Sequence, residues 1–273
     1  MSAGISNEPM RRWLRRLVHW LRAVVLSHRA SSGPADPAGF DATALASLYA
    51  DVSRPQGVDL DELAARLDRL FTLDRSGTDL QAYREGRKPW KRLREEVVPV
   101  TALLVGRGRQ GRVRFPLSDS PPDAWFQPAG RADWIGVEAT GALIRSQREL
   151  AKDLPNHVVA SGFRALPDQA PQKAFDAARA RGRLLHSRRG VERSIAEAVA
   201  TALERKNHPK YQGQILLVNA PLEALPAHDW SSSLSLPRDR DPAPPFVQIF
   251  VQGEGARARP VEIYARTGAD GLI

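Results

Sequence analysis

The sequence predicts an α/β protein in which a helical N-terminal region precedes a domain of mixed helices and strands. Through the first third of the chain, apolar residues recur at three- and four-residue spacing, which is typical of amphipathic helices. From residue 99 onward, short apolar or alternating runs bounded by Gly and Pro become common, which is typical of strands. We therefore divide the chain into a helical region over 1–87 and an α/β domain over 88–273.

The helical region begins with a predicted basic amphipathic helix at 8–28, in which Trp13, Leu17 and Leu21 form an apolar stripe between arginines. Such a helix suits an anionic membrane surface, nucleic-acid phosphates or a partner protein, and packing on the protein's own core is an equal alternative. The Ser/Gly/Pro-rich stretch 31–38 is predicted to be a linker. Further helices are predicted at 41–51, 59–72 and about 78–97, the last interrupted by Gly86 and Pro89.

The α/β domain is predicted from short apolar runs. Residues 100–105 form an apolar run of strand length, and residues 112–115 alternate as a strand does. Residues 122–140 contain two short strand patterns around the Pro128/Gly130 turn, which predicts a hairpin. The remaining predicted elements are helices at 142–154, 170–182 and 191–207, a buried strand at 214–219, a loop at 229–245, and late strands at 246–251 and 261–265.

Composition limits the classes of function. The chain has 273 residues, 42% of them hydrophobic and 26% charged, which is typical of a globular protein. It contains no cysteine, which excludes disulfides, zinc–thiolate sites and thiol nucleophiles. No apolar run approaches 18 residues, so no membrane-spanning helix is predicted. Arginines interrupt the first apolar run, which argues against an export signal, and a cytoplasmic location is expected.

The net charge is strongly positive. Forty Lys and Arg residues against 31 acids give a formal net charge of +9 and a pI near 10.4. This excess favours a polyanionic partner, and DNA is the expected nucleic acid. A general enrichment in arginine through genome composition is the alternative. The residues predicted to contact the nucleic-acid backbone are Arg107, Arg109, Arg112, Arg188 and Arg189.

The predicted hairpin carries two acids that could hold one divalent metal. Asp123 opens its first strand and Glu138 lies on its second. The period of two places Glu138 on the face of Gly136 and Thr140, and we expect Gly136 to leave room for an approaching group. Two carboxylates on neighbouring strands are a common way to hold Mg²⁺ or Mn²⁺ beside a phosphate.

A lysine on the 191–206 helix completes the candidate site. At 100° per residue, Lys206 continues the apolar stripe that contains Ile195, Val199 and Ala202. A lysine at the edge of a buried stripe must extend to solvent or meet an opposite charge. A carboxylate pair at the sheet would supply that charge, and the ammonium could then assist the attacking water or stabilise the transition state.

In their order along the chain, the elements resemble the PD-(D/E)XK nuclease superfamily. The features that carry the resemblance are Pro122-Asp123, Glu138-Ala139-Thr140, and a helix ending in Lys206 before a Leu-Leu-Val strand. The resemblance covers roughly residues 88–220. It implies a restriction-endonuclease-like αβββαβ core, to which this chain appends a C-terminal β-hairpin. It also implies that Asp123 and Glu138 bind Mg²⁺ in a metal-dependent nuclease.

The chain departs from this family at one position. Thr140 stands where the family has a lysine, two residues after the glutamate. Some members take this lysine from the following helix, the position of Lys206, and others that lack it are inactive binding modules. A nuclease and a non-catalytic nucleic-acid-binding or complex-assembly protein are therefore both open. The family often adds an acid on the helix before the first strand, which Glu95 or Glu96 could supply.

Each candidate residue has a purely structural alternative. Asp123 could be a turn residue after two prolines, Glu138 could pair with an arginine, and Lys206 could complement a helix C-terminus. Asp133 is a rival for the role of the first acid because it starts the Glu138 strand, but its parity places it on the other face, so it ranks second to Asp123.

Overall fold

The computed structural model describes residues 42–72, 77–142, 173, 188–225, 227–236, 243–253, 260–268 and 273. The predicted helices at 8–28, 142–154 and 170–182 lie outside the described residues, apart from single positions. A search of the described helices finds none with the length and apolar character needed to span a bilayer.

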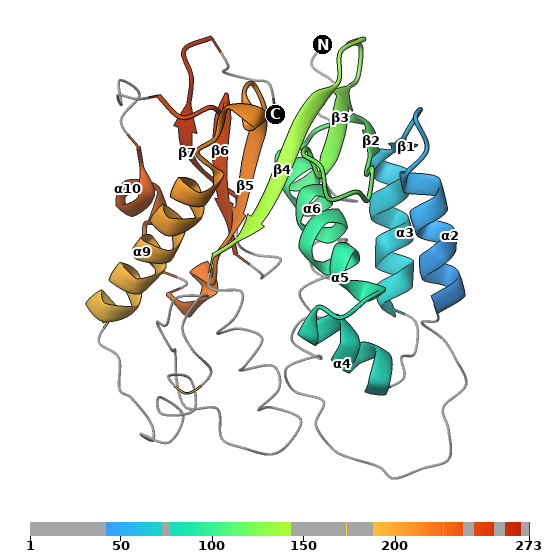
Figure 1. Ribbon diagram of the computed structural model, residues 1–273, viewed down its shortest axis with the longest axis horizontal. Helices are drawn as coiled ribbons and strands as arrows, with labels where there is room; N and C mark the ends of the chain where they lie inside the picture. The colour runs from blue at the N-terminus through green and yellow to red at the C-terminus, as the bar shows by residue number, and fades with distance from the viewer. Residues whose placement is uncertain are drawn as a thin grey trace, which may run out of the picture.

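A seven-stranded mixed sheet forms the centre of the molecule (Figure 1), and its strands lie side by side in chain order from β1 to β7. Neighbouring strands are antiparallel from β1 to β4, parallel from β4 through β5 to β6, and antiparallel again between β6 and β7. The strands are β1 (Val58–Asp59), β2 (Gly111–Arg114), β3 (Ala124–Pro128), β4 (Ile135–Gly141), β5 (Ile215–Asn219), β6 (Gln248–Gln252) and β7 (Val261–Ala265).

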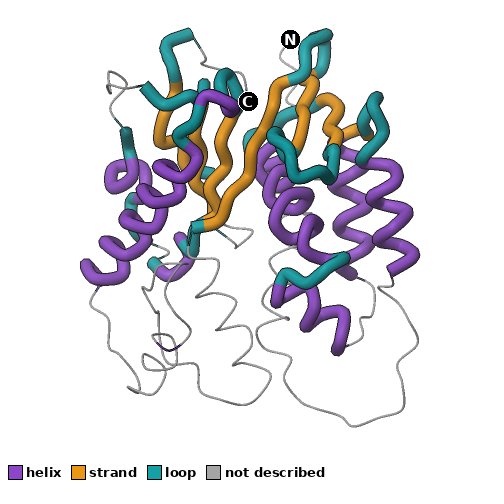
Figure 2. Tube along the Cα trace, viewed as in Figure 1, coloured by secondary structure: helices purple, strands orange, loops and turns teal. Residues whose placement is uncertain are grey.

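Helices cover both faces of this sheet (Figure 2), and each side has its own hydrophobic core. The helices on one side are α2 (Ala42–Val52), α3 (Leu60–Thr72), α4 (Gly77–Glu85), α5 (Trp90–Arg92), the π-helical turn η1 (Leu93–Val97) and α6 (Val98–Gly106). The other side carries α9 (Arg188–Lys206) and α10 (Trp230–Leu234), and the 3₁₀ turns are η2 (Pro209–Tyr211) and η3 (Leu222–Ala224).

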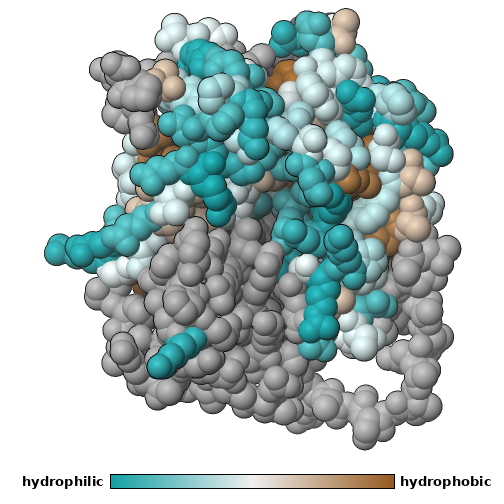
Figure 3. Space-filling view, in the orientation of Figure 1, coloured by the Kyte–Doolittle hydropathy of each residue, from teal (hydrophilic) through white to brown (hydrophobic). Residues whose placement is uncertain are grey.

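The two cores meet at the central strands because side chains alternate across the sheet. On β5, Ile215 and Leu217 pack with α3 and α6, whereas Leu216 and Val218 pack with α9. All four are fully buried, which is why this strand is a continuous apolar run without visible alternation. The surface in Figure 3 is correspondingly hydrophilic over most of its described area, with small hydrophobic patches.

Most predicted elements are confirmed. The helices at 41–51, 59–72 and 191–207 correspond to α2, α3 and α9. The interruption of the third helix at Gly86 and Pro89 separates α4 from α5. The strands at 112–115 and 214–219, both strands of the hairpin, and the two late strands are also present.

The prediction of a strand at 100–105 is wrong, because these residues belong to α6. This helix continues directly from η1, and Val100, Leu103 and Leu104 are fully buried. A short helix enclosed by the sheet and α3 is apolar on all sides, so its sequence shows no helical period and resembles a buried strand. The correction leaves the order helix, three strands, helix, strand intact, with β2 as the first strand.

The predicted loop at 229–245 is wrong in its first part, where α10 forms a short helix. The Asp229 carboxylate caps it by accepting bonds from the backbone N–H groups of Ser231 and Ser232. Trp230 and Leu234 then bury their side chains against the α9 side of the sheet.

The boundary at residues 87 and 88 stays a prediction. Helices α2 and α3 share one core with α6 and the sheet, and β1 adds a short edge strand beside β2.

Candidate active site

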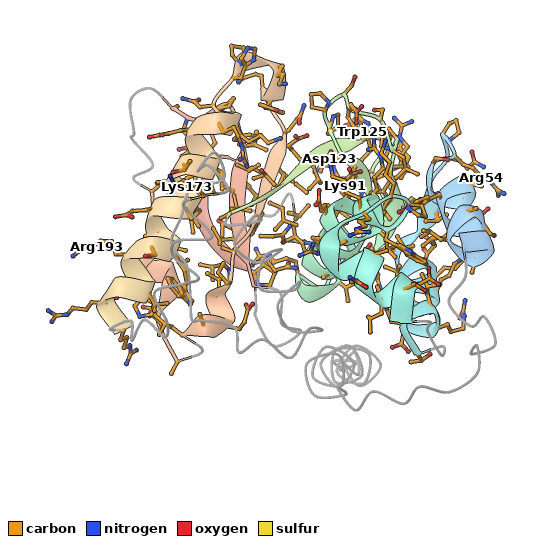
Figure 4. The ribbon with its side chains drawn as sticks, turned by 60° about the horizontal axis from the view of Figure 1, so that its bottom comes forward. Arg54, Lys91, Asp123, Trp125, Lys173 and Arg193 are labelled. Carbon is orange, nitrogen blue, oxygen red and sulfur yellow. The ribbon has the colours of Figure 1, made fainter. Side chains whose placement is uncertain are left out.

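The β3–β4 hairpin brings the two predicted acids together. Ala124 pairs with Val137 in the antiparallel ladder. Asp123, one residue before Ala124, therefore lies opposite Glu138, one residue after Val137. Asp123 Oδ2 accepts a hydrogen bond of 2.8 Å from the backbone N–H of Ala139, which holds this carboxylate against β4. Figure 4 marks Asp123 at the entry to β3. The structural alternative of a simple turn residue therefore does not describe this side chain.

The predicted alternation along β4 is confirmed. Val137 and Ala139 belong to the core on the α6 side, and the Glu138 side chain points to the α9 side, where Lys206 meets it. The space expected beside Gly136 is filled by the protein itself. A Cβ at Gly136 would lie 3.1 Å from side-chain atoms of both Pro122 and Gln214, so this glycine allows close packing and leaves no room for a ligand.

Lys206 meets the predicted carboxylate. Its Nζ donates to Glu138 Oε1 at 2.5 Å, and the side chains are 17% and 5% exposed, respectively. The same Nζ lies 3.4 Å from the hydroxyl oxygen of Tyr211 and 5.1 Å from the centre of its ring. The expectation that Lys206 must meet a charge is thus confirmed. Lys206 is also the last residue of α9.

The second oxygen of Glu138 is the least satisfied atom of the site. Glu138 Oε2 is buried and has no hydrogen-bond partner in the part of the chain that the structure describes. A buried carboxylate oxygen without a donor is costly, and a cation would offset that cost. It lies on the carboxylate that Lys206 already binds, next to Asp123, so the two acids fit a divalent cation by their chemistry and position.

No third acidic or histidine side chain joins these two acids in the described ranges. Within them, no three Asp, Glu or His side chains lie close enough to hold a metal ion together. Mg²⁺ is commonly held by one or two carboxylates, with water and substrate phosphate completing its shell. Asp133, the second choice for the first acid, is an exposed residue of the turn before β4.

Of the two helix acids, Glu96 is the one that interacts with the site. The pKa of Glu96 is raised to about 7, first by burial and second by the charge of Asp123, against the opposing effect of Arg92. Arg92 donates to Glu96 at 3.1 Å and to Asp119 at 2.8 Å, which ties η1 to the segment that leads into β3. Glu95 instead pairs with Lys91 at 3.9 Å.

Asp123 holds its proton more strongly than an ordinary aspartate does. Its pKa is raised to about 6, first by burial and second by the charge of Glu138, against the opposing effects of the Ala139 N–H, Lys206 and Arg92. For Lys206, burial alone would lower the pKa, but the hydrogen bond to Glu138 and its charge outweigh burial, so the pKa is raised. The ammonium therefore stays charged, whereas Asp123 ionises within the physiological range.

Arg205 is a site residue that the sequence analysis missed. Its Nη2 donates to Thr140 Oγ1 at 2.8 Å and to the carbonyl oxygen of Gly141 at 3.2 Å. The position that holds a lysine in the resembled family thus has a guanidinium beside it. The only hint in the sequence was that Arg205 directly precedes Lys206. The helical period, however, points Arg205 away from the buried stripe of α9.

The five predicted backbone-contacting arginines are not brought together. Arg112 donates to the carbonyl oxygens of Gln56 and Gly57, and Arg107 pairs with Glu262 at 3.3 Å. Arg109 lies near Arg107, and burial lowers its pKa first, with the charge of Arg107 second. The remaining two, Arg188 and Arg189, are exposed at the start of α9.

Glu96 gives a prediction about stability. A carboxyl whose pKa is raised on folding binds more protons when folded, so its ionisation destabilises the protein as pH rises from 4.5 to about 7. Glu96→Gln, which imitates the neutral acid, should match wild type near the lower pH. Above pH 7 it should be more stable by on the order of 2 kcal/mol. Urea unfolding at both pH values measures this difference.

The control for this prediction is Glu197→Gln, which changes an exposed acid on α9. It should alter the free energy of unfolding by less than about 0.5 kcal/mol at either pH. An equal stability gain for Glu96→Gln at both pH values would contradict the role assigned to ionisation.

Comparisons with protein-family models, curated proteins and solved structures give no match for this chain.

Proposed function

We propose that this protein is a metal-dependent phosphodiesterase that cleaves nucleic acid, with a core of the PD-(D/E)XK type. The observation that carries the proposal is the buried Glu138 carboxylate, which is bound to Lys206 through one oxygen and unpartnered at the other, next to Asp123. If the ion pair were purely structural, the unpartnered buried oxygen and the second carboxylate beside it would both destabilise the protein.

The order of elements supports the same proposal. Helix α6 is followed by β2, β3 and β4, then by α9 and by β5, which lies parallel to β4. This is the order αβββαβ that the resemblance implies. The strands β6 and β7 extend the sheet beyond it as the appended hairpin.

Asp123 and Glu138 would hold Mg²⁺ or Mn²⁺, which when bound polarises a phosphate oxygen and lowers the pKa of water. Lys206 keeps its charge at neutral pH and can donate a hydrogen bond to a phosphate oxygen as negative charge develops there. Tyr211 and Glu138 limit the directions in which this ammonium can point. Arg205 adds a second positive charge beside Thr140.

A non-catalytic nucleic-acid-binding protein is the second candidate, and one observation favours it. The guanidinium of Arg205 is engaged by Thr140 and Gly141, so the motif position is filled by a structural contact. In that case the positive charge would serve binding, and the carboxylates would only anchor Lys206.

Cleavage assays on single- and double-stranded DNA and RNA decide between these candidates. We expect wild type to cut at least one substrate with Mg²⁺ or Mn²⁺ and none with EDTA, and Glu138→Gln to cut no faster than the background. Glu204→Gln, an exposed acid two residues before Lys206, is the matched control and should cut as wild type does. Salt-sensitive binding without cleavage under any metal would overturn the phosphodiesterase and leave the binding protein.

A further inference from the structure

Two tryptophans and an arginine lie together on the outer face of the β2–β4 sheet. The guanidinium carbon of Arg114 lies 5.5 Å from the ring centre of Trp125 and 5.1 Å from that of Trp134. Arg114 and Trp125 are directly opposite each other in the β2–β3 pairing. We call these three residues the Trp–Arg cluster.

The cluster lies on the face that does not carry the α6 core. Val113, Phe115 and Phe126, which alternate with its members, are fully buried in that core. The members of the cluster are only partly buried. Tryptophan is enriched at recognition surfaces, because its large apolar ring can be covered by a ligand while its N–H group stays available for a hydrogen bond.

The cluster has an unused donor. Arg114 Nε is buried, and among the described residues it has no hydrogen-bond partner and Arg114 forms no ion pair with an acid. An arginine stacked on indole rings keeps its positive charge and directs N–H groups outward along its plane. An aromatic surface next to a cation suits a ligand that has a flat aromatic ring close to a negatively charged group.

The position of the cluster connects it to the carboxylates. Trp125 is the second residue of β3, and Asp123 immediately precedes that strand, so extended geometry places their side chains on one face and their Cα atoms about 7 Å apart. A phosphate placed at Asp123 and Glu138 would therefore have its neighbouring nucleotide within reach of the indole of Trp125.

We infer that the Trp–Arg cluster is a stacking platform for the base of an unpaired nucleotide next to the cleaved phosphate. This inference rests on the proposed function, since the carboxylates define where the phosphate lies. Bases inside a duplex have both faces covered by their neighbours, so a platform of this kind favours single strands or unpaired positions. The base would stack on Trp125, and Arg114 would donate to its carbonyl groups or to the adjoining phosphate.

The test compares two variants that both remove the indole but differ in aromaticity. Trp125→Leu should weaken binding of single-stranded oligonucleotides roughly 5- to 150-fold, which is the range that loss of one stacked base produces. Trp125→Phe keeps a smaller stacking surface and should lose much less. Binding is measured with EDTA at one fixed salt concentration, using single-stranded DNA, single-stranded RNA and the corresponding duplexes.

A second readout is independent of affinity. Stacking of a base should quench the fluorescence of Trp125, so saturating wild type with oligothymidylate should lower emission by more than it does in Trp125→Phe. Arg54→Ala removes an exposed arginine in the turn after α2 and shows how much binding changes when one positive charge outside the cluster is lost. The melting temperatures of all variants are compared to separate lost binding from lost folding.

The outcomes separate this inference from the proposed function. If Trp125→Leu binds and cleaves single strands as wild type does, the platform is overturned and the phosphodiesterase remains. If wild type cleaves nothing but shows the quenching and the Trp125-dependent preference for single strands, the phosphodiesterase is overturned and the platform remains. If wild type binds no nucleic acid, both are overturned. The two single-stranded probes show which sugar the platform accepts.

Discussion

Lys206→Met should destabilise the protein by about 3–5 kcal/mol at neutral pH, because it leaves a buried carboxylate without its partner. Glu138 is 5% exposed and has one oxygen bound by Lys206 and the other unpartnered. Removing the ammonium would expose the full desolvation cost of the carboxylate. Chemical denaturation at pH 7.5 measures the change.

A double-variant cycle isolates the pair from the other effects of the substitutions. Glu138→Leu should cost a similar amount, since it leaves the ammonium unpaired. The combined Glu138→Leu and Lys206→Met protein should return to within about 2 kcal/mol of wild type, because two apolar side chains replace two charges. Strictly additive losses in the double variant would show that the two side chains do not depend on each other.

The matched control for this cycle is Lys210→Met. Lys210 is exposed, and its Nζ lies 4.8 Å from the ring centre of the same Tyr211, but no carboxylate of the described residues pairs with it. The change should therefore cost less than about 1 kcal/mol.

Asp123→Asn should reduce the rate of metal-dependent cleavage by at least about 10³-fold, because one of two charged ligands to the proposed metal becomes neutral. The hydrogen bond from the Ala139 N–H to this side chain can survive, because an amide oxygen also accepts. The fold should therefore be kept, and circular dichroism checks this. Single-turnover rates at saturating metal give the reduction.

The pH dependence of wild type tests the same residue. Asp123 must be ionised to bind a cation, and its pKa is raised to about 6. The rate should rise about tenfold per pH unit below pH 6 and level off above it. In Asp123→Asn the residual rate should no longer follow this titration. A wild-type profile that is flat between pH 5 and 7 would remove Asp123 from the reaction.

The sequence by itself predicted much of the site because the relevant signals are local. Period-two alternation placed Glu138 opposite the apolar face of β4, and the helical period placed Lys206 on the buried stripe of α9. Both assignments needed only the spacing of apolar residues along one element. The need of a semi-buried lysine for a negative partner then follows from the cost of desolvating a charge.

Local patterns were insufficient where an element is enclosed on all sides. Residues 100–105 are apolar at every position except Thr101, and this composition suits a buried strand and a buried helix equally. In the structure these residues form a helix because they continue directly from η1 and pack between α3 and the sheet. The space predicted beside Gly136 failed for a related reason, since Pro122 and Gln214 from other segments fill it.

Sequence alone therefore determined the α/β class, the hairpin and the faces on which Glu138 and Lys206 lie. Tertiary structure decided that Glu96 rather than Glu95 lies near Asp123, that Arg205 binds Thr140, and that Arg114 stacks on two tryptophans. The physical reason is distance along the chain. Periodicity fixes the direction of a side chain relative to its own backbone, but contacts between elements depend on how their surfaces pack.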